Sequence, residues 1–363
     1  MRNILFFIIG FHCCTQFVLS CTTFALQGDS GLVVGKSFDW HESHGMLVAN
    51  KRNVFKIAER YHSSDDPVEW TSKYGSLTFN QHGREFPLGG INEKGLVAEI
   101  MLGPSEHIDS SDPRKSINEL QWIQYVLDNF DSLPRFLSAI ESIRVSKVFA
   151  SVHYMVCDAN GDCAAVEYLD QTIFPHLGPL LPVKAFTNDS YSRSLLKLRR
   201  YIGFGGRKRI PGGARSIARF VRTASLLQRY DPAQDVFDSA STILHSVANG
   251  GGQWQTIYKD GHLVFTEREG TAGTKKVEIT KLDFHCLHPV KVLNLEAEIS
   301  GEVTNQFEDY TDALNAEMIS RSTLTPAEIK QMLIGYPSKT RCKEDANAAT
   351  AISQKSWVVH SNS

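Results

Sequence analysis

The order of hydrophobic periodicities along the chain restricts its fold more than any other feature. Strand-like runs dominate from residue 22 to about residue 101, and two blocks of helical periodicity interrupt the strands that follow. The expected strands are 22–27, 31–39, 46–57, 75–79, 96–101, 150–157, 163–168, 183–187, 255–258, 262–266 and 276–280, and the expected helices are 116–129, 131–143, 190–202, 214–230 and 233–248. Strands and helices grouped in separate blocks predict an α+β fold.

Local signals indicate where the first helix begins. Ser116 and Glu119 have the spacing of a capping box, just before an apolar-periodic run that ends near Asn129. Pro134 lies where the first turn of the next helix is expected. We therefore expect a pair of helices between two blocks of strands.

The first twenty residues have the pattern of a cleaved secretion signal. A positive start precedes the apolar run Ile4–Cys14, which is shorter than the roughly 20 residues that span a bilayer. Val18 and Ser20 are small residues at the −3 and −1 positions of a cut before Cys21. We expect cleavage there, a secreted or periplasmic product and no stable membrane insertion. The alternative is that residues 1–20 form a buried core strand or helix.

Cleavage before Cys21 would leave an odd number of cysteines. Cys157 and Cys163 flank a turn sequence and could face each other across a hairpin, and Cys286 with Cys342 would form a second pair. Cys21 would then be the unpaired thiol, as suits a reactive cysteine, although the sequence is also compatible with no disulfide. The C-x5-C spacing differs from that of a zinc knuckle, so we expect no metal site.

Charge and composition limit the classes of partner. The formal net charge is −2 at pH 7, so we expect no nucleic-acid partner. The basic triplet 207–209 lies in a Gly- and Pro-rich link, and simple solvation explains it. No shift in composition marks a second domain, so we expect one domain over 21–336 and a poorly ordered polar tail over 337–363.

A cysteine at a new N-terminus carries a nucleophile and a base on one residue. A thiol with an ordinary pKa near 8.5 is only partly ionised at neutral pH. The α-amine of the same residue has an ordinary pKa of about 7.7–8.0 and can take the thiol proton. Cys21 could therefore attack a carbonyl, form a thioester and release the acid to water, given an anion, a cation and oxyanion donors nearby.

Five short blocks carry the strongest remaining signal. They are Cys21-Thr22-Thr23-Phe24, Gly35-Lys36-Ser37-Phe38-Asp39-Trp40, Gly90-Ile91-Asn92-Glu93-Lys94-Gly95-Leu96, Phe186-Thr187-Asn188-Asp189-Ser190-Tyr191 with Leu195, Leu198 and Tyr201, and Ala218-Arg219-Phe220-Val221-Arg222. In this order and spacing the blocks resemble the choloylglycine hydrolase and penicillin V acylase family of N-terminal nucleophile hydrolases. The resemblance is weaker onward to Thr280.

The resemblance implies a four-layer αββα sandwich, in which two mainly antiparallel sheets lie between helical layers. It implies hydrolysis of a linear, non-peptide C–N bond in a small-molecule N-acyl amide, without a metal or an organic cofactor. Relatives are commonly tetrameric, so it also implies a homo-oligomer. Conjugated bile salts, phenoxyacyl penicillins and acyl-homoserine lactones all stay open as substrates.

The resemblance also implies a role for each matched residue. Cys21 would be the nucleophile and, through its α-amine, the base, and Asp39 would hold that amine or the thiol. Asn188 would donate to the oxyanion, Arg219 would stabilise the thiolate, and Lys36 stands where the family uses a basic residue, usually arginine.

Two positions depart from the family pattern. Ser37 stands where asparagine is common. The residue that completes the oxyanion hole falls on Leu102, which has no side-chain donor. That contribution must come from a backbone N–H or be absent.

Each polar candidate has a structural alternative. Asp39 could cap a turn, and Asn188 could cap the helix that follows it. Arg215 or Arg222 could be the matching arginine in place of Arg219.

Aromatic residues near these blocks are candidates for the wall of an acyl pocket. Phe24, Trp40, Trp254 and Tyr258 would supply apolar area, with Leu102 beside them. The alternative is that these aromatics belong to the core.

Two other functions compete with the amidase. Val18-Leu19-Ser20-Cys21 loosely fits a lipobox, so the chain could be a binding protein anchored by a lipid on the cysteine sulfur. An acyltransferase on the same fold would resolve the thioester with an amine instead of water.

Overall fold

The computed structural model describes residues 21–28, 31–40, 42–61, 65–105, 111–248, 252–267, 273–322 and 327–344. The predicted signal peptide, residues 1–20, lies outside the described residues. Among the residues that are described, no helix is both long and apolar enough to cross a bilayer.

Strands are more numerous than helices. The strands are β1 (Thr22–Gly28), β2 (Gly31–Asp39), β3 (Met46–Asn50), β4 (Val54–Ile57), β5 (Glu69–Thr71), β6 (Ser76–Asn80), β7 (Pro87–Asn92), β8 (Val97–Leu102), β9 (Ser116–Asn118), β10 (Arg144–Ser146), β11 (Val152–Cys157), β12 (Cys163–Leu169), β13 (Thr172–Leu177), β14 (Ala185–Phe186), β15 (Gly252–Lys259), β16 (His262–Glu267), β17 (Thr274–Glu278), β18 (Lys291–Asn294), β19 (Gly301–Glu302), β20 (Glu308–Asp309) and β21 (Arg341–Cys342). The α-helices are α1 (Glu119–Asn129), α2 (Leu133–Ala139), α3 (Tyr191–Leu198), α4 (Ser216–Arg229), α5 (Val236–Val247), α6 (Asp312–Arg321) and α7 (Ala327–Gly335).

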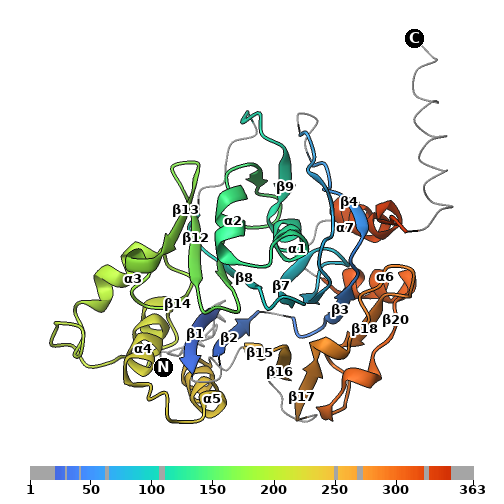
Figure 1. Cartoon of the computed structure of the whole chain (residues 1–363). Coiled ribbons are helices and arrows are strands. Elements are labelled where there is room, and N and C mark those ends of the chain that lie inside the picture. The colour runs from blue at the N-terminus through green and yellow to red at the C-terminus, as the bar shows by residue number, and fades with distance from the viewer. Residues whose placement is uncertain are drawn as a thin grey trace, which may run out of the picture.

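Two mainly antiparallel sheets form the centre of the molecule. One has the strand order β14-β1-β2-β15-β16-β17-β19, and the other has the order β13-β12-β11-β8-β7-β6-β3-β18-β20. Helix α1 packs on β7 and β8, whereas α4 packs on β1 and β14, and α5 packs on β1 and β2 (Figure 1). The Thr23 hydroxyl on β1 lies 3.3 Å from the Met101 sulfur on β8, so the sheets face each other. This arrangement is the αββα sandwich that the resemblance implies.

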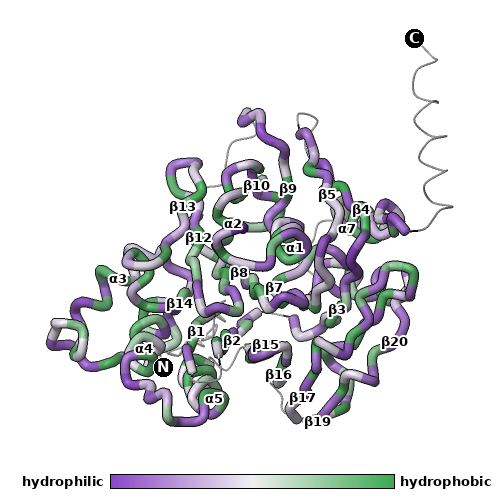
Figure 2. Tube along the Cα trace, viewed as in Figure 1, coloured by the Kyte–Doolittle hydropathy of each residue, from purple (hydrophilic) through white to green (hydrophobic). Residues whose placement is uncertain are grey.

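Hydropathy follows these layers. Figure 2 shows green hydrophobic residues mixed with hydrophilic ones along α1 and α5. Helix α5 buries one face, whereas α1 is buried along most of its length. The hydrophobic core includes residues from Cys21 to Tyr336.

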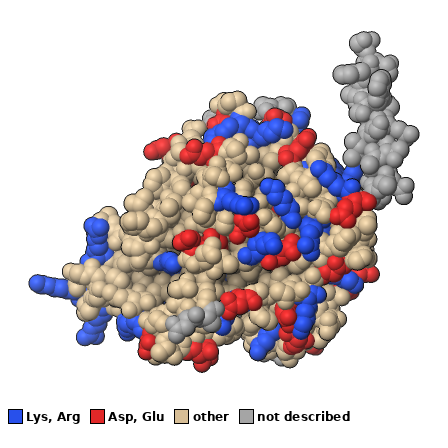
Figure 3. Space-filling view, viewed as in Figure 1, with Lys and Arg blue, Asp and Glu red and all other residues tan. Residues whose placement is uncertain are grey.

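The long connection between α3 and α4 stands out from the body, and Figure 3 shows blue cationic side chains projecting at that end. The basic triplet 207–209 in this connection is exposed, as solvation requires.

The β1–β2 hairpin brings the chain start beside the end of its second strand. Its register pairs Thr22 with Ser37 and continues unbroken to Gly28 opposite Gly31. A Cβ built at Gly35 would lie 2.3 Å from the Phe24 ring, so only glycine lets this ring lie flat across the neighbouring strand. The hairpin thereby places Cys21 next to the last residues of β2.

The first helix begins differently from the expected capping box. Ser116 lies in β9, and the N-cap is Asn118, whose side chain accepts from the N–H groups of Leu120 and Gln121. The Glu119 carboxylate bonds instead to the backbone of residues 148–150. A strand that runs directly into a helix leaves no room for a cap two residues earlier.

The expected strand 46–57 is two strands in two different sheets. Strand β3 pairs with β6 and β18, whereas β4 pairs with β5 and β21. The break includes Asn53, which has a φ of 60°, a left-handed conformation that ends a strand. Periodicity continues across this break, which is why the sequence suggests one strand.

Several elements carry weak local signals that do not predict them from the sequence, namely β13, β18, α6 and α7.

The C-terminal segment differs in part from the poorly ordered tail expected over 337–363. Strand β21 pairs with β4, and Cys342 forms a disulfide with Cys286. A second disulfide joins Cys157 to Cys163 across the β11–β12 turn. Residues 345–363 lie outside the described residues.

Candidate active site

Cys21 lies immediately before β1 and opens onto a cavity of about 290 Å³ between the two sheets and α1. Its side chain is buried, and it is the free cysteine of the described part of the chain. The cavity wall is mainly apolar. Its lining residues are Cys21, Phe38, Trp40, His82, Leu88, Ile100, Met101, Leu102, Glu119, Leu120, Phe149, Ala150 and Val152.

Strand β2 ends on a charged residue close to the thiol, Asp39. The backbone N–H of Asp39 donates to the Cys21 sulfur, and the Ser37 hydroxyl lies 3.3 Å from an Asp39 carboxylate oxygen. Because Asp39 is the last residue of β2, the hairpin register alone brings it to Cys21.

Lys36 points between the sheets and is held on β8. Its ammonium donates to the Ile100 carbonyl and lies 3.5 Å from the Glu99 carboxylate. Glu99 also accepts from the Tyr258 hydroxyl at 2.6 Å. A Cβ at Gly89, the cross-strand partner of Glu99, would lie 2.2 Å from that carboxylate, so the site needs glycine there.

Arg219 enters the site from the first turn of α4. It is completely buried and donates to the Cys21 carbonyl and to the Thr22 hydroxyl. Its other terminal nitrogen donates to the Asn188 side-chain oxygen at 2.8 Å, and the Asn188 amide donates to the Leu102 carbonyl at 2.8 Å. A continuous hydrogen-bonded chain therefore joins α4, the segment after β14 and the end of β8.

Charge and burial oppose each other at the thiol. Burial raises the pKa of Cys21, Lys36 and Arg219 lower it, and the Asp39 carboxylate raises it. Burial also lowers the pKa of Arg219 to about 10, although the Asp39 carboxylate raises it. This guanidinium therefore stays charged at neutral pH. The thiol thus faces two cations and one anion but keeps its proton in this environment.

The structure separates the three candidate arginines. Arg215 is exposed and is the N-cap of α4. Arg222 donates to the backbone carbonyls of Pro211, Gly213 and Ser246. Arg219 is the arginine at Cys21.

The expected pocket residues divide into two groups. Trp40 and Leu102 line the cavity, whereas Phe24, Trp254 and Tyr258 are buried elsewhere. Trp254 stacks on the cavity residue Phe38 with ring centroids 4.2 Å apart, and so supports the wall from behind. Phe24 lies on the opposite face of β1 from Thr23, which faces the other sheet. Trp254 and Tyr258 do face between the sheets, but they pack beside the cavity and not in its wall. All three aromatics belong to the hydrophobic core.

Sequence reasoning missed other residues of the cavity. His82 is buried, and burial lowers its pKa to about 4, so the imidazole is neutral at pH 7. Glu119 and Phe149 come from α1 and from the β10–β11 connection. No local pattern marks these residues, because each reaches the cavity only through the packing of distant elements.

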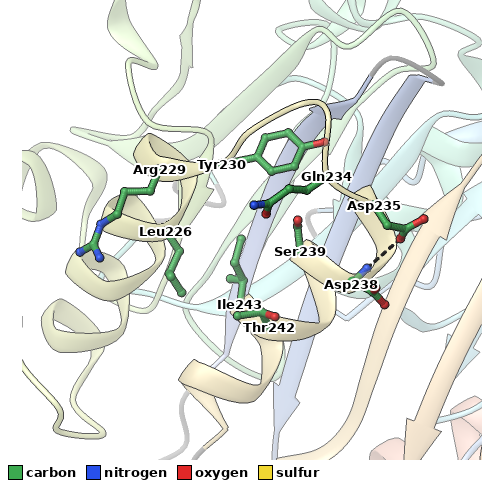
Figure 4. A pocket seen from close by; sticks show the side chains of 9 residues that line it. All are labelled: Leu226, Arg229, Tyr230, Gln234, Asp235, Asp238, Ser239, Thr242 and Ile243. Atoms are coloured by element: carbon green, nitrogen blue, oxygen red, sulfur yellow. Dashed lines mark hydrogen bonds between the residues drawn. The ribbon is translucent and has the colours of Figure 1, made fainter.

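A second hollow lies outside the sandwich, between α4 and α5 (Figure 4). It has a volume of about 410 Å³ and is lined by residues such as Tyr230, Gln234 and Asp235. Asp235 is the N-cap of α5 and accepts from the Asp238 N–H at 3.0 Å, so its carboxylate has a structural role. None of the predicted site residues lines this hollow. Within the described ranges, no group of three or more His, Cys, Asp or Glu side chains is arranged to hold a metal ion.

Comparison with known proteins assigns the family. The model of the linear amide C-N hydrolases, choloylglycine hydrolase family, matches residues 21–267, well over half of the chain. The chain belongs to this family. The resemblance seen in the five sequence blocks is thereby confirmed.

A curated protein is similar to this chain in sequence. The penicillin V acylase of Pectobacterium atrosepticum is 31% identical over 238 residues. The match covers 59% of this chain and 61% of that protein, so it spans less than two thirds of the curated relative.

Solved structures share the fold. Penicillin V acylase from Agrobacterium tumefaciens has a TM-score of 0.70 and 25% identity, covering 80% of this chain and 98% of that one. A variant of the conjugated bile acid hydrolase from Clostridium perfringens has a TM-score of 0.63 and 18% identity, covering 77% of this chain and 98% of that one. The expected αββα architecture is confirmed.

Proposed function

We propose that this member of the choloylglycine hydrolase family is a secreted amidase that uses Cys21 as its nucleophile. It would hydrolyse linear, non-peptide C–N bonds of small N-acyl amides once residues 1–20 are removed. One observation carries the proposal: the free Cys21 thiol opens onto an apolar cavity and lies among Lys36, Asp39 and Arg219.

Removal of residues 1–20 would change the chemistry of the thiol. It frees the Cys21 α-amine, which takes the thiol proton and becomes a further cation beside the sulfur. The thiolate then attacks the amide carbon, the ammonium proton passes to the departing amine, and water hydrolyses the thioester. Asp39 would hold the ammonium, and Arg219 would favour the thiolate.

Asn188 is the proposed side-chain donor to the oxyanion. Its amide nitrogen carries two N–H groups, so one can hold the Leu102 carbonyl while the other faces the developing negative charge. Arg219 holds the Asn188 oxygen, which fixes the direction of the amide. Leu102 would thus position Asn188 through its carbonyl, and its side chain would donate nothing to the oxyanion.

The size of the cavity favours a small acyl group. The cavity has a volume of about 290 Å³, near the lower end for small-molecule sites, and a mainly apolar wall. An aryloxyacetyl or medium-chain acyl group is apolar and much smaller than the steroid of a bile acid, so it suits this cavity better. The similarity to two penicillin V acylases supports the same choice.

A hydrolysis panel on the mature protein tests the proposal. Phenoxymethylpenicillin, a medium-chain acyl-homoserine lactone and a conjugated bile salt would be compared, together with the N-terminal sequence and intact mass. We expect a chain that begins at Cys21, turnover of the first two substrates, and loss of nearly all turnover in Cys21→Ser, because an alcohol is a far poorer nucleophile.

Three results would overturn the proposal. A lipid increment on Cys21 would make the residue an anchor and block both its sulfur and its amine. A mature N-terminus at another position would leave Cys21 without its base. Acyl transfer to an added amine, in preference to hydrolysis, would make the protein a transferase.

A further inference from the structure

Glu119 is a buried carboxylate beside the acyl cavity that the proposed reaction does not use. It is the first residue of α1, and its side chain is inaccessible to solvent. Its two oxygens accept from the backbone N–H groups of Val148, Phe149 and Ala150, at 2.9 Å for the first and 2.8 Å for the last. One side chain thus binds three consecutive peptide groups.

The segment held by Glu119 is part of the cavity wall. Phe149 and Ala150 line the same cavity as Cys21, and so does Glu119 itself. They lie between β10 and β11 and belong to neither strand. The Phe149 ring also packs on His82 at a centroid distance of 6.0 Å. Outside a sheet, a wall of this kind is positioned by whatever satisfies its backbone donors.

The backbone of Glu119 is fixed independently of its carboxylate. Asn118 caps the helix at this point, and the Tyr154 hydroxyl donates to the Glu119 carbonyl at 2.9 Å. The carboxylate is therefore a rigid anchor. Burial raises the pKa of the Glu119 carboxyl, whereas the N–H groups of residues 148–150 favour its charged form. Hydrogen bonds to that charged form are roughly twice as strong as neutral ones, so they hold the loop in place.

We propose that Glu119 is a positioning residue that sets acyl selectivity by holding residues 148–150 as one wall of the cavity. This inference rests on the proposed amidase function. A carboxylate is required because all three partners are donors. A glutamine would place one oxygen and one NH2 group there, and the NH2 hydrogens would face backbone N–H groups.

The test compares two N-acyl amides that share one leaving amine, one with an acetyl group and the other with a phenoxyacetyl group. In Glu119→Gln we expect kcat/KM for the phenoxyacetyl amide to fall about tenfold or more, mainly through KM, because the misplaced wall no longer packs on the ring. The acetyl amide, which does not reach the wall, should change less than about threefold. Glu119→Asp keeps the charge and should retain part of the selectivity.

Glu93→Gln is the matched control. The Glu93 carboxylate also accepts a backbone N–H, that of Gly75 at 2.9 Å, but it does not line the cavity. In this variant kcat/KM for both amides should equal the wild-type values. Phe149→Ala removes the ring from the wall without touching Glu119, and should reproduce the loss on the phenoxyacetyl amide.

Binding of phenoxyacetate to the Cys21→Ser protein gives a readout without turnover. Calorimetry should show a Kd at least about tenfold weaker when Glu119→Gln is added. An equal loss on both amides, or unchanged phenoxyacetate binding, would overturn the role of Glu119. A wild-type protein that binds phenoxyacetate but hydrolyses neither amide would instead refute the proposed amidase function.

Discussion

At the residue scale, the environment of Cys21 does not by itself make a thiolate. Burial raises the pKa of the thiol, and Asp39 adds to that effect, so Lys36 and Arg219 compensate only in part. A free α-ammonium would add the missing positive charge on the same residue. In our proposal, removal of residues 1–20 therefore supplies both the base and part of the electrostatic activation.

Substitution of Lys36 tests this balance through pH. Lys36 lowers the pKa of Cys21, so Lys36→Met should raise it and shift the alkylation of Cys21 by iodoacetamide to higher pH, by about one unit. Glu99 would take up a proton in the variant, because burial already raises its pKa. Lys36→Arg keeps the charge and should leave the curve in place. If the pH dependence of alkylation in Lys36→Met coincides with that of the wild type, Lys36 does not influence the pKa of Cys21.

Asn188 is tested by the removal of its amide. Asn188→Ala should lower kcat by roughly 100-fold or more, as the loss of an oxyanion donor does in other enzymes. The control is Asn129→Ala, which removes an amide that donates to the Tyr125 carbonyl near the end of α1. Steady-state kinetics on the best substrate of the panel would decide, and an unchanged kcat would exclude Asn188 from the reaction.

At the scale of elements, the site depends on close approach between strands. Glu99 on β8 can lie flat between the sheets because Gly89 on β7 has no side chain opposite it. The Glu99 carboxylate then meets both Lys36 and Tyr258. A single glycine thus makes room for a charged network inside a close-packed interior. In such an interior even one added carbon atom affects stability.

Substitution of that glycine should be costly. In Gly89→Ala the new Cβ would meet the Glu99 carboxylate at 2.2 Å, so we expect a loss of about 1–3 kcal/mol in the free energy of unfolding from overpacking. Gly213→Ala is a suitable control, because a Cβ there has no heavy atom within 4 Å. Urea unfolding of both variants would measure the difference. Equal stability of the two would show that Glu99 can move aside freely.

At the scale of the whole molecule, a covalent link ties the C-terminal segment to the sandwich. The Cys286–Cys342 disulfide joins residues 56 positions apart, and β21 next to it pairs with β4. The Cys157–Cys163 disulfide spans only 6 positions within one hairpin. The longer loop restricts the unfolded chain more.

The two disulfides should therefore differ in their effect on stability. Replacing Cys286 and Cys342 by serine should lower the free energy of unfolding by up to about 4 kcal/mol, against about 2 kcal/mol for Cys157 and Cys163. Urea unfolding of the oxidised mature protein measures both. The reverse order would show that native-state contacts, and not chain entropy, dominate the difference.

Features that depend on neighbouring residues can be predicted from the sequence. Strand and helix periodicity indicates the α+β order, and the turn at 28–30 predicts the hairpin that brings Asp39 to Cys21. The five ordered blocks indicate the family, and they single out Asn188 and Arg219 as site candidates. The strand, helix and turn patterns can be recognised in one sequence because they reflect φ/ψ preferences and burial over a few residues.

Contacts between distant elements become visible in the three-dimensional structure. It selects Arg219 over two nearby arginines, since Arg219 alone of the three is buried against Cys21, 198 positions away. It divides 46–57 between two sheets, and it joins Glu119 to the wall of the cavity. The physical reason is that burial and hydrogen-bond partners depend on how layers pack, and one-dimensional periodicity carries no information about which layer faces which.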